Sequence, residues 1–570
     1  MRQVGTSFRV EPSGLVVRGL LAAVLIVALL LSMTTWRVYG HTWDEPEHLA
    51  AGMELLDRGK YEYDMQHPPL ARLMIALGPY LAGARSIGSP PPDGTPEGVA
   101  ILYGSGHYDQ YLLLARLGTL PFLALLLVTT WLWARRIFTS DRESLLAVTL
   151  LVATPPILGH AALATLDVPA AATILLALYA IQRWVAAGNW WETVLLGLSA
   201  GIAFATKLSA VPFLLIGVAT LSAVDSACHH GSQSVRAATL PLQRGGHRRV
   251  VPLLTAALIA LVCLILAYGG RFTYYTDAAH QANPTLNYLF GGAGAWHNLA
   301  YAVAAHVPLP IGLRAFVEGI RAVLWHNEIG HLSYLLGRVA THGWWYFYPV
   351  ALAVKTPIPM LLTGPPGLVL LARDGWRERD GWRMAPLALA VALLTFASLY
   401  SHINIGIRHV LILYPFLAFG SAHVLAVAWR RLRNVSDRDW AGVGAATVVI
   451  LAGWQVSTLV TANPDYLPYF NEAVTDPEKV LVDSDLAWGQ DLRRLERKLA
   501  ELKVPAFSFA YLGTADLKRE TFPPLTRLAP GHPTTGWVAI TALARVHAQT
   551  GYAWLDAYTP VERIGKSIDL

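Results

Sequence analysis

Charged residues and cysteines are scarce in this chain, and each shortage excludes a class of protein. Of the 570 residues, 14% are charged and 54% are hydrophobic, which is not the balance of a soluble globular domain. The two cysteines, Cys228 and Cys263, form neither an extracellular disulfide framework nor a metal-binding motif. The formal charge of +6 does not indicate nucleic-acid binding, because most basic residues lie in short loops between apolar runs.

Long apolar runs recur along most of the chain and predict a polytopic membrane protein. The first run, Leu15–Trp36, is not followed by a small-residue cleavage site, so we expect a retained helix rather than a signal peptide. No internal repeat is visible beyond the spans themselves. We predict about eleven spans, at residues 15–36, 110–134, 144–160, 168–187, 193–206, 208–225, 250–270, 345–372, 384–400, 410–429 and 440–460.

Arginine-rich loops indicate the orientation of these spans. With the N-terminus in the cytoplasm, the positive-inside rule places inside the loops that hold Arg135-Arg136, Arg183, Arg236–Arg249, Arg373–Arg383 and Arg430–Arg438. This topology requires residues 193–225 to cross twice, as two short spans hinged near Thr206-Lys207. We therefore expect an integral plasma-membrane protein with a cytoplasmic N-terminus and an extracytoplasmic C-terminal region.

Three predicted outside segments are large, namely 37–109, 271–344 and 461–570. In the last of them, Val480–Val482, Phe507–Leu512 and Trp537–Thr541 have the pattern of strands, and Gln490–Leu502 that of an amphipathic helix. We expect two domains: an all-α transmembrane domain over residues 1–460 and a small extracytoplasmic α/β domain over residues 461–570.

An acidic pair, Asp44-Glu45, follows the first span almost directly. Charged groups are costly in hydrocarbon, so carboxylates at its edge raise the question of a functional site. The alternative is a structural one, in which Asp44 or Glu45 caps a short helix that begins at Pro46 and ends at Gly59. The residues of this stretch alone leave both interpretations open.

Other charged residues fall on the same predicted side of the membrane. Asp167 begins the fourth span, Lys207 lies at the hinge, and Arg408 lies between the ninth and tenth spans. Basic residues outside run against the topological bias, which favours a functional role for Lys207 and Arg408. Asp167 could instead cap its helix, and Arg271 at a helix end could extend to lipid headgroups.

Two further candidates lie in less certain surroundings. His67 begins the stretch His67–Leu77, which predicts a second short outer helix with an apolar face suited to the membrane interface. Lys355 falls within an apolar run, so either the span begins after it or this lysine binds an anionic group.

These motifs, in this order, resemble the protein O-mannosyltransferases and their bacterial relatives, including the aminoarabinose transferases that modify lipid A. The residues that carry the resemblance are Asp44-Glu45, His67-Pro68-Pro69-Leu70-Ala71-Arg72, Leu166-Asp167-Val168-Pro169, Thr206-Lys207, Gly343-Trp344-Trp345-Tyr346 and Ile405-Gly406-Ile407-Arg408-His409. The resemblance covers about residues 15–460. It implies a GT-C fold and transfer of a sugar from a polyprenyl-phosphate carrier at the extracytoplasmic face.

The chain also departs from this family. Residues 271–344 are too few to hold the inserted domain of the eukaryotic O-mannosyltransferases, and Arg72 stands where those enzymes usually have lysine. The donor sugar and the acceptor therefore cannot be carried over from either branch. A protein, a glycolipid or a polysaccharide hydroxyl is compatible with the sequence, and a nucleic-acid partner is not expected.

The residue types favour a specific division of labour. A sugar on a lipid phosphate already has an anionic leaving group, so the site needs cations rather than a general acid. Lys207 and Arg408 are the candidates for that charge, with Arg72 and Arg271 as further ones.

One carboxylate suffices as the base for a single inverting displacement, and the resemblance also favours Asp44 for this role. Glu45 would orient the acceptor or hold Arg72, and Asp167 would support the site. Dependence on Mg²⁺ or Mn²⁺ stays open, since oxygen ligands suit both ions.

Two other classes of function stay open. A transporter or flippase of a lipid-linked or anionic substrate would also be polytopic. Such proteins usually consist of two repeated halves, and their ionisable residues usually lie near the bilayer midplane. A non-catalytic membrane scaffold could use its outer domain to bind a partner.

Overall fold

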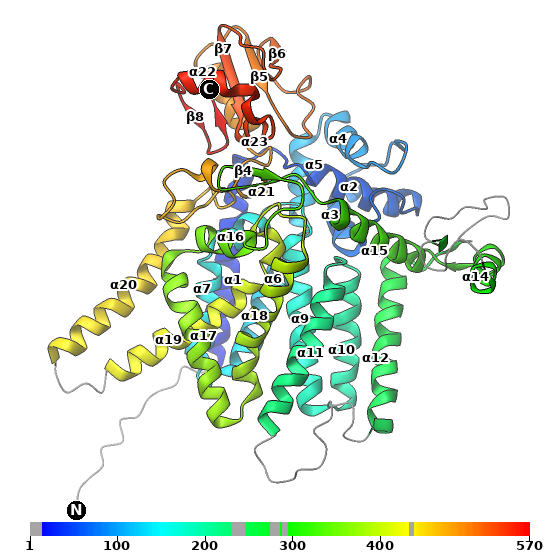
Figure 1. Cartoon of the computed structure of the whole chain (residues 1–570), viewed down its shortest axis with the longest axis vertical. Helices are drawn as coiled ribbons and strands as arrows, with labels where there is room; N and C mark the ends of the chain where they lie inside the picture. Colours follow the sequence, from blue (N-terminus) through cyan, green and yellow to red (C-terminus); the bar gives the residue numbers. More distant parts are fainter. Residues whose placement is uncertain (1–13, 230–245, 274–285, 288–293, 433–437) are drawn as a thin grey trace, which may run out of the picture.

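The computed structural model describes residues 14–229, 246–273, 286–287, 294–432 and 438–570. Apolar helices form a bundle, and a C-terminal region with a small sheet stands at one end of it (Figure 1). The helices of the bundle are α1 (Gly14–Thr34), α5 (Tyr108–Leu117), α6 (Leu120–Ile137), α7 (Asp141–Val152), α8 (Pro155–Ala161), α9 (Asp167–Ala187), α10 (Trp190–Phe204), α11 (Ala210–His229), α12 (Gly246–Ala267), α16 (Phe347–Lys355), α17 (Ile358–Glu378), α18 (Gly381–Tyr400), α19 (Leu413–Leu432) and α20 (Arg438–Ala462).

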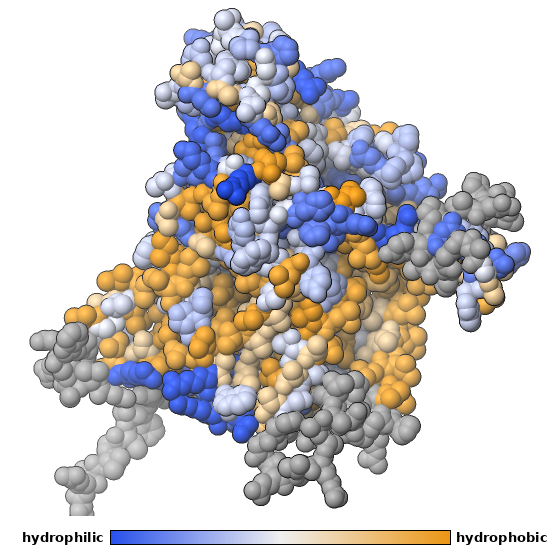
Figure 2. Space-filling model, viewed as in Figure 1, coloured by the Kyte–Doolittle hydropathy of each residue, from blue (hydrophilic) through white to orange (hydrophobic). Residues whose placement is uncertain are grey.

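Packing sets α9 at the centre of this bundle. Helix α9 contacts α6, α10 and α11, and its side chains are buried along almost its whole length. Outer helices such as α1, α12 and α20 expose most of their apolar residues, as helices that face lipid do. Figure 2 shows the result as a hydrophobic surface over the bundle, with hydrophilic surface over the C-terminal region and along the opposite edge.

The protein is an integral membrane protein. Within the described residues, seven stretches are long and apolar enough to cross a membrane: Gly14–Arg37, Tyr108–Ile137, Asp167–Ala187, Ala210–Cys228, Val250–Ala267, Gly381–Tyr400 and Gly442–Ala462. The pair α7 and α8, bent by 66° where Pro155 and Pro156 begin the second helix, counts as an eighth stretch if the two helices form one broken span. These stretches coincide with eight of the about eleven predicted spans and not with the other three, so the number of spans stays a prediction.

Those three predicted spans also coincide with helices. Residues 193–206 fall on α10, residues 345–372 on α16 and α17, and residues 410–429 on α19. The two short helices expected around the Thr206-Lys207 hinge are present as α10 and α11. Most of the arginine-rich loop expected inside before the seventh span, residues 230–245, lies outside the described residues.

Short helices and hairpins cover the end of the bundle near the C-terminal region. They come from the segments predicted to lie outside, and α2, α3 and α4 pack against one another. These elements are the 3-10 helix η1 (Thr35–Arg37), α2 (Glu45–Met53), the π-helix η2 (Glu54–Arg58), α3 (Leu70–Leu81), α4 (Thr95–Gly104), β1 (Phe272–Thr273), α14 (Ala295–His306), β2 (Leu309–Pro310), α15 (Ile311–Ile329), β3 (Ser333–Leu335), β4 (Arg338–Ala340) and the 3-10 helix η4 (Ile407–Val410).

The C-terminal region is built on a five-stranded sheet of order β6-β5-β7-β9-β8. Strand β5 pairs in parallel with β6 and β7, and β9 pairs antiparallel with β7 and β8. The elements are η5 (Pro477–Lys479), α21 (Asp483–Leu486), α22 (Leu492–Glu501), β5 (Phe507–Ala510), β6 (Leu525–Arg527), β7 (Trp537–Thr541), α23 (Ala542–His547), η6 (Gln549–Ala557), β8 (Arg563–Ile564) and β9 (Ile568–Asp569).

The strands predicted at Phe507–Leu512 and Trp537–Thr541 and the helix at Gln490–Leu502 are therefore confirmed as β5, β7 and α22. The strand predicted at Val480–Val482 is wrong. These residues are apolar because Val480 and Leu481 pack against the main core and Val482 packs in a smaller cluster with Leu486 and Leu543, and not because they belong to a sheet.

Candidate functional site

Asp44 lies at the start of the site, in the turn between the first membrane helix and α2. It occupies the N-cap position of α2, but its side chain makes no capping hydrogen bond. Its carboxylate instead forms an ion pair with the Nη1 of Arg408, which is 364 residues away in the sequence. The Asp44 side chain therefore pairs with Arg408 and does not cap α2.

Arg408 comes from η4, the short helix between α18 and α19. Its Nη1 also lies 3.9 Å from Oδ2 of Asp167, and its side chain is only 9% exposed. Burial favours the neutral form of the guanidinium, but the carboxylates of Asp44 and Asp167 outweigh it and raise the pKa of Arg408 on balance. The Nε of Arg408 is buried and has no hydrogen-bond partner among the described residues.

Asp167 and Lys207 complete the cluster. Asp167 is the first residue of α9, makes no capping bond, and accepts a hydrogen bond of 2.9 Å from Nζ of Lys207 in the α10–α11 loop. The Asp167 carboxylate is 2% exposed, and its Oδ2 accepts no hydrogen bond from any described residue. Two carboxylates and two cations therefore alternate in one cluster, as the sequence-based topology predicted for these four residues.

Glu45 has a different environment from its neighbour Asp44. Its two oxygens receive hydrogen bonds of 2.7 and 2.8 Å from Nε and Nη2 of Arg116, and both side chains are 1% exposed. The backbone N–H groups of Thr42 and Ala164 donate to the same carboxylate. Burial opposes ionisation of Glu45, but Arg116 and these donors lower its pKa. The expectation that Glu45 holds Arg72 is wrong.

Arg72 is fully buried and is used within the outer segment itself. It forms an ion pair with Asp64 and donates to the Tyr61 hydroxyl at 3.0 Å and to His48 Nδ1 at 3.3 Å. These bonds tie the loop before α3 to α2. Because most of its donors are already occupied, the assignment of Arg72 to a carrier phosphate is not supported by its geometry.

His67 lies inside the same region as a buried imidazole. Its ring stands edge-on to that of His48, with 5.6 Å between the ring centroids. Burial lowers the pKa of His67 to about 3, so the ring is neutral at physiological pH. The structure thus gives His67 no charge with which to hold an anion.

Lys355 and Arg271 lie outside the cluster. Lys355 ends α16, is completely buried, and donates to the carbonyl oxygens of Leu467 and Asp485 at 2.9 and 2.7 Å. The Lys355 ammonium is therefore already hydrogen-bonded to the C-terminal region. Arg271 is exposed beside Gly59, and no ion pair joins it to another residue in the described part of the chain.

The sequence analysis missed residues that the C-terminal region brings to this site. Asp483 begins α21 beside Arg408, and burial raises the pKa of its carboxyl to about 7, with Arg408 acting against the rise and Asp44 adding to it. Trp488 lies against the Arg408 guanidinium, whose central carbon is 4.5 Å from the ring centroid. The available signal was a run of acids, tryptophan and glycine at 483–491 that suits neither a strand nor a span.

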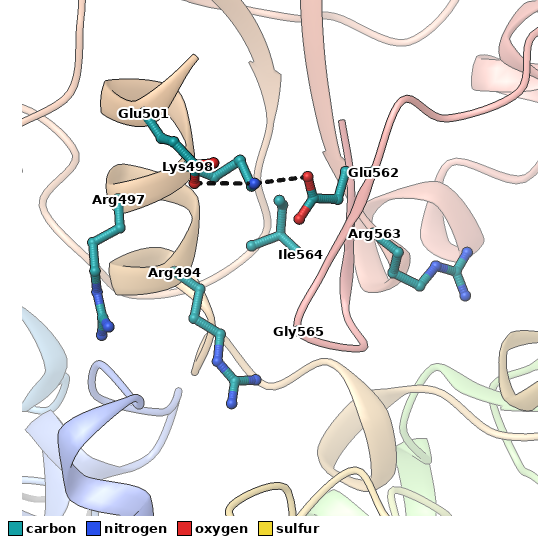
Figure 3. Close-up of a pocket in the computed structure, with 8 residues that line it drawn as sticks. All are labelled: Arg494, Arg497, Lys498, Glu501, Glu562, Arg563, Ile564 and Gly565. Carbon is teal, nitrogen blue, oxygen red and sulfur yellow. Dashed lines mark ion pairs between the residues drawn. The ribbon is translucent and has the colours of Figure 1, made fainter. Parts of the chain in front are cut away.

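A separate pocket of about 220 Å³ lies in the C-terminal region, between α22 and β8 (Figure 3). Two of its cations are paired with carboxylates: Lys498 pairs with Glu501 and Glu562 at 3.0 and 2.9 Å, and Arg563 pairs with Asp569 at 2.8 Å. No member of the Asp44 cluster lines it. We therefore do not place the functional site there.

Metal coordination does not fit the residues of the cluster. In the described ranges, no three His, Cys, Asp or Glu side chains come together as ligands for a metal ion. Asp44 and Asp167 face Arg408 and Lys207 instead. No step is therefore derived through Mg²⁺ or Mn²⁺.

Comparison with protein families gives one match. Residues 112–233, which contain α9, α10 and the Asp167 and Lys207 positions, match the model described as dolichyl-phosphate-mannose-protein mannosyltransferase. The resemblance to the O-mannosyltransferase family is confirmed. No curated protein matches the chain.

The chain is also similar to solved structures of other proteins, among them three with TM-scores below 0.5. ArnT from Cupriavidus metallidurans bound to undecaprenyl phosphate has 13% identity and a TM-score of 0.48, over 97% of this chain and 98% of that one. The S. cerevisiae protein O-mannosyltransferase Pmt1-Pmt2 complex bound to the sugar donor has 11% identity and a TM-score of 0.49, over 80% and 90%. The Archaeoglobus fulgidus oligosaccharyltransferase with a tethered acceptor peptide has 14% identity and a TM-score of 0.43, over 78% and 55%. Identities this low say nothing about substrates.

Proposed function

We propose that this protein is a membrane glycosyltransferase that moves a sugar from a polyprenyl-phosphate carrier to an acceptor hydroxyl. The observation that carries the proposal is the cluster of Asp44, Asp167, Lys207 and Arg408, which four distant parts of the chain bring together at one end of the bundle. The family match over residues 112–233 supports sugar transfer from a lipid-linked donor.

The cations of the cluster would hold the carrier phosphate. Arg408 offers a planar set of donors that matches phosphate oxygens, and its Nε is not engaged by any described residue. Lys207 adds a point charge, and its side chain is 13% exposed, so it is partly accessible. Asp167 keeps the lysine in place through the 2.9 Å hydrogen bond.

Binding of the phosphate would also release the base. In the absence of substrate, the Asp44 carboxylate is engaged in its ion pair with Arg408. A phosphate anion competes with Asp44 for the same guanidinium, so we expect Arg408 to turn toward the phosphate. The Asp44 carboxylate, 22% exposed, is then free to accept a hydrogen bond from the acceptor hydroxyl.

The chemical step that follows is a single displacement. The acceptor oxygen forms a bond to the anomeric carbon, the bond from that carbon to the phosphate oxygen breaks, and the acceptor proton passes to Asp44. The phosphate leaves with the electron pair as a polyprenyl phosphate, stabilised by Arg408 and Lys207. Attack from the face opposite the leaving group inverts the anomeric configuration.

The proposed orientation follows from the same residues. The cluster lies at the end of the bundle that carries the C-terminal sheet region, so residues 461–570 would form an extracytoplasmic α/β domain above a transmembrane domain of residues 1–460 (Figure 1). The carrier reaches the cluster from the membrane and the acceptor from the aqueous side. A protein, glycolipid or polysaccharide hydroxyl would serve as acceptor.

Substitution of the base tests the proposal. Purified protein is given undecaprenyl-phosphate sugars that carry a label in the lipid, together with acceptor membranes from cells that lack the gene, and free undecaprenyl phosphate is measured. The wild type should release it from at least one sugar. Asp44→Asn should lower the rate at least about 100-fold, because general base catalysis contributes that much or more.

The same variant should still bind undecaprenyl phosphate, and more tightly than the wild type, because Arg408 loses its competing carboxylate. Asp57→Asn is the matched control, since Asp57 lies in η2 and pairs with Arg85 at 3.7 Å, and an asparagine oxygen can still accept its hydrogen bond from the N–H of Ser86. Release by Asp44→Asn at the wild-type rate would remove Asp44 from the role of base. The absence of release from every sugar by the wild type would reject the transferase proposal.

A further inference from the structure

The C-terminal region contacts the candidate site directly, through the segment Asp483–Asp491. Trp488 of this segment is 2% exposed, although it lies in a region that folds around a separate sheet. Its ring faces the Arg408 guanidinium, 4.5 Å from the central carbon to the ring centroid, and lies 6.1 Å from the ring of His160. The tryptophan therefore fills the space between α8 and the arginine of the site.

The backbone around Trp488 is tied to the segment that presents Asp44. The N–H of Trp43 donates to the carbonyl of Trp488 at 3.0 Å, and the N–H of Gly40 donates to that of Gln490 at 2.9 Å. The Gln490 side chain in turn accepts from the N–H of Trp488 at 2.8 Å. These backbone hydrogen bonds thus fix the segment that contains Asp44 relative to the segment that contains Trp488.

The loop that presents Arg408 is shaped by the same C-terminal segment. Asp485 accepts a hydrogen bond of 3.1 Å from the N–H of Ile407, and the Ser484 hydroxyl donates to the carbonyl of Ile405. Gly406 has a φ of +141°, and a Cβ at this position would collide with the Ser484 hydroxyl. The Arg408 loop is therefore hydrogen-bonded to this part of the C-terminal region and closely packed against it.

An arginine that exchanges partners needs a contact that does not use its donors. Arg408 is proposed to leave Asp44 for a phosphate, and during that exchange its N–H groups change partners. The face of an indole attracts the guanidinium through the ring quadrupole and leaves all five N–H groups free. Trp488 is the aromatic ring that meets the guanidinium in this way.

We propose that Trp488 is a positioning residue for the carrier phosphate, so that the C-terminal region completes the anion site instead of being a separate module. The ring fixes the plane of the Arg408 guanidinium while its edge turns from Asp44 to the phosphate monoester of the polyprenyl carrier. This inference rests on the proposed function, because it assigns the anion at Arg408 to that carrier.

The test measures the Kd of undecaprenyl phosphate for the full-length protein in detergent. Trp488→Leu keeps an apolar side chain without a ring and should weaken binding by about tenfold, as the loss of a desolvated cation–π contact implies. Trp488→Phe keeps a ring and should restore most of the affinity. Trp554→Phe is the control, because Trp554 lies in η6 and contacts Tyr558 rather than Arg408.

Fluorinated tryptophans at position 488 keep the test valid where Trp488→Leu fails to fold. Each added fluorine withdraws electron density from the ring and leaves its shape nearly unchanged, so the affinity should fall in steps. In an Arg408→Gln background the same series should give a much shallower slope, because no cation then faces the ring. A merely structural role for Trp488 would give no dependence on fluorine number.

Two failures of this experiment have different meanings. If the wild type does not bind undecaprenyl phosphate, the proposed function itself is rejected. If the wild type binds it and the Leu, Phe and fluorinated variants all bind equally well, the transferase proposal stands and the positioning role of Trp488 is rejected.

Discussion

At the scale of single residues, the site is a set of buried charges whose pairing changes with its ligand. Asp44, Arg408, Asp167 and Lys207 neutralise one another in the structure, which is how charges are tolerated beside a membrane. An incoming phosphate is attracted to the cations and repelled by the carboxylates. Its affinity is therefore set by how many carboxylates around Arg408 are ionised.

Asp483 makes this affinity depend on pH. Burial raises the pKa of its carboxyl to about 7, with Arg408 on η4 acting against the rise and Asp44 before α2 and Asp485 on its own helix adding to it. Below that pH Asp483 is neutral, and above it the residue adds a negative charge beside Arg408. We expect the wild type to bind undecaprenyl phosphate more weakly, relative to Asp483→Asn, as the pH rises through about 7.

The comparison with Asp483→Asn is needed because the lipid phosphate itself loses its second proton near pH 6, which strengthens binding to cations in both proteins. The measurement is the ratio of the two Kd values from about pH 5.5 to about pH 8.5, around the two pKa values. A ratio that does not change over this range would show that Asp483 carries the same charge throughout.

The sequence predicted the four charged residues of the cluster but not their partners. Parity of the spans placed Asp44, Asp167, Lys207 and Arg408 on one side of the membrane, and this needed only apolar runs and arginine-rich loops. Which carboxylate pairs with which cation depends on how the loops fold over the bundle. The periodicity of apolar residues carries no information about that folding. Asp44 and Glu45 are adjacent, yet one faces Arg408 and the other Arg116.

At the scale of elements, α2 is the part that fixes the base in place. It begins directly after Asp44, and the buried Glu45–Arg116 pair joins its first residue to α5. The helix continues into η2 and ends at Gly59, with φ of +63°, which is where the sequence predicted its end. The predicted short helix was correct because its proline start and glycine stop act locally.

Loss of one partner of the buried pair should destabilise the protein strongly. Glu45→Ala leaves the Arg116 charge buried without its carboxylate, at a cost of about 3–5 kcal/mol. The melting temperature in detergent should fall accordingly. The double variant Glu45→Ala with Arg116→Met should recover part of that loss, because no unpaired charge is left inside.

The control for this pair is Arg314→Met, which removes a partly exposed i,i+4 pair with Glu318 and should change the melting temperature little. Equal melting temperatures for Glu45→Ala and the wild type would contradict the role of Glu45 as the anchor of α2.

At the scale of the whole molecule, the chain combines a helical bundle with a C-terminal region that stands at one end of it (Figure 1). Hydropathy predicted the bundle well, because apolar length is a strong signal. It could not predict that the C-terminal region belongs to the site, because Trp488 and Asp483 contact Arg408 only after folding. The prediction of two domains, divided at residue 460, therefore did not include these contacts between the two parts.

The proposed topology can be tested by cysteine labelling. After replacement of Cys228 and Cys263, single cysteines at the exposed positions Lys60 and Lys503 should react with an impermeant maleimide on intact cells or spheroplasts. A cysteine at the exposed position Arg136, in the last turn of α6, should react only once the membrane is opened. Labelling of the Arg136 position from outside would reverse the orientation and with it the proposed side of the reaction.

The most direct test of the account is an experimental structure of the protein with undecaprenyl phosphate. The account predicts phosphate oxygens at hydrogen-bond distance, about 2.7–2.9 Å, from Arg408 and Lys207, with the Arg408 guanidinium still stacked on Trp488 and Asp44 released from it. A headgroup bound elsewhere, with the Asp44–Arg408 pair intact, would contradict the claim that these charges form the carrier site.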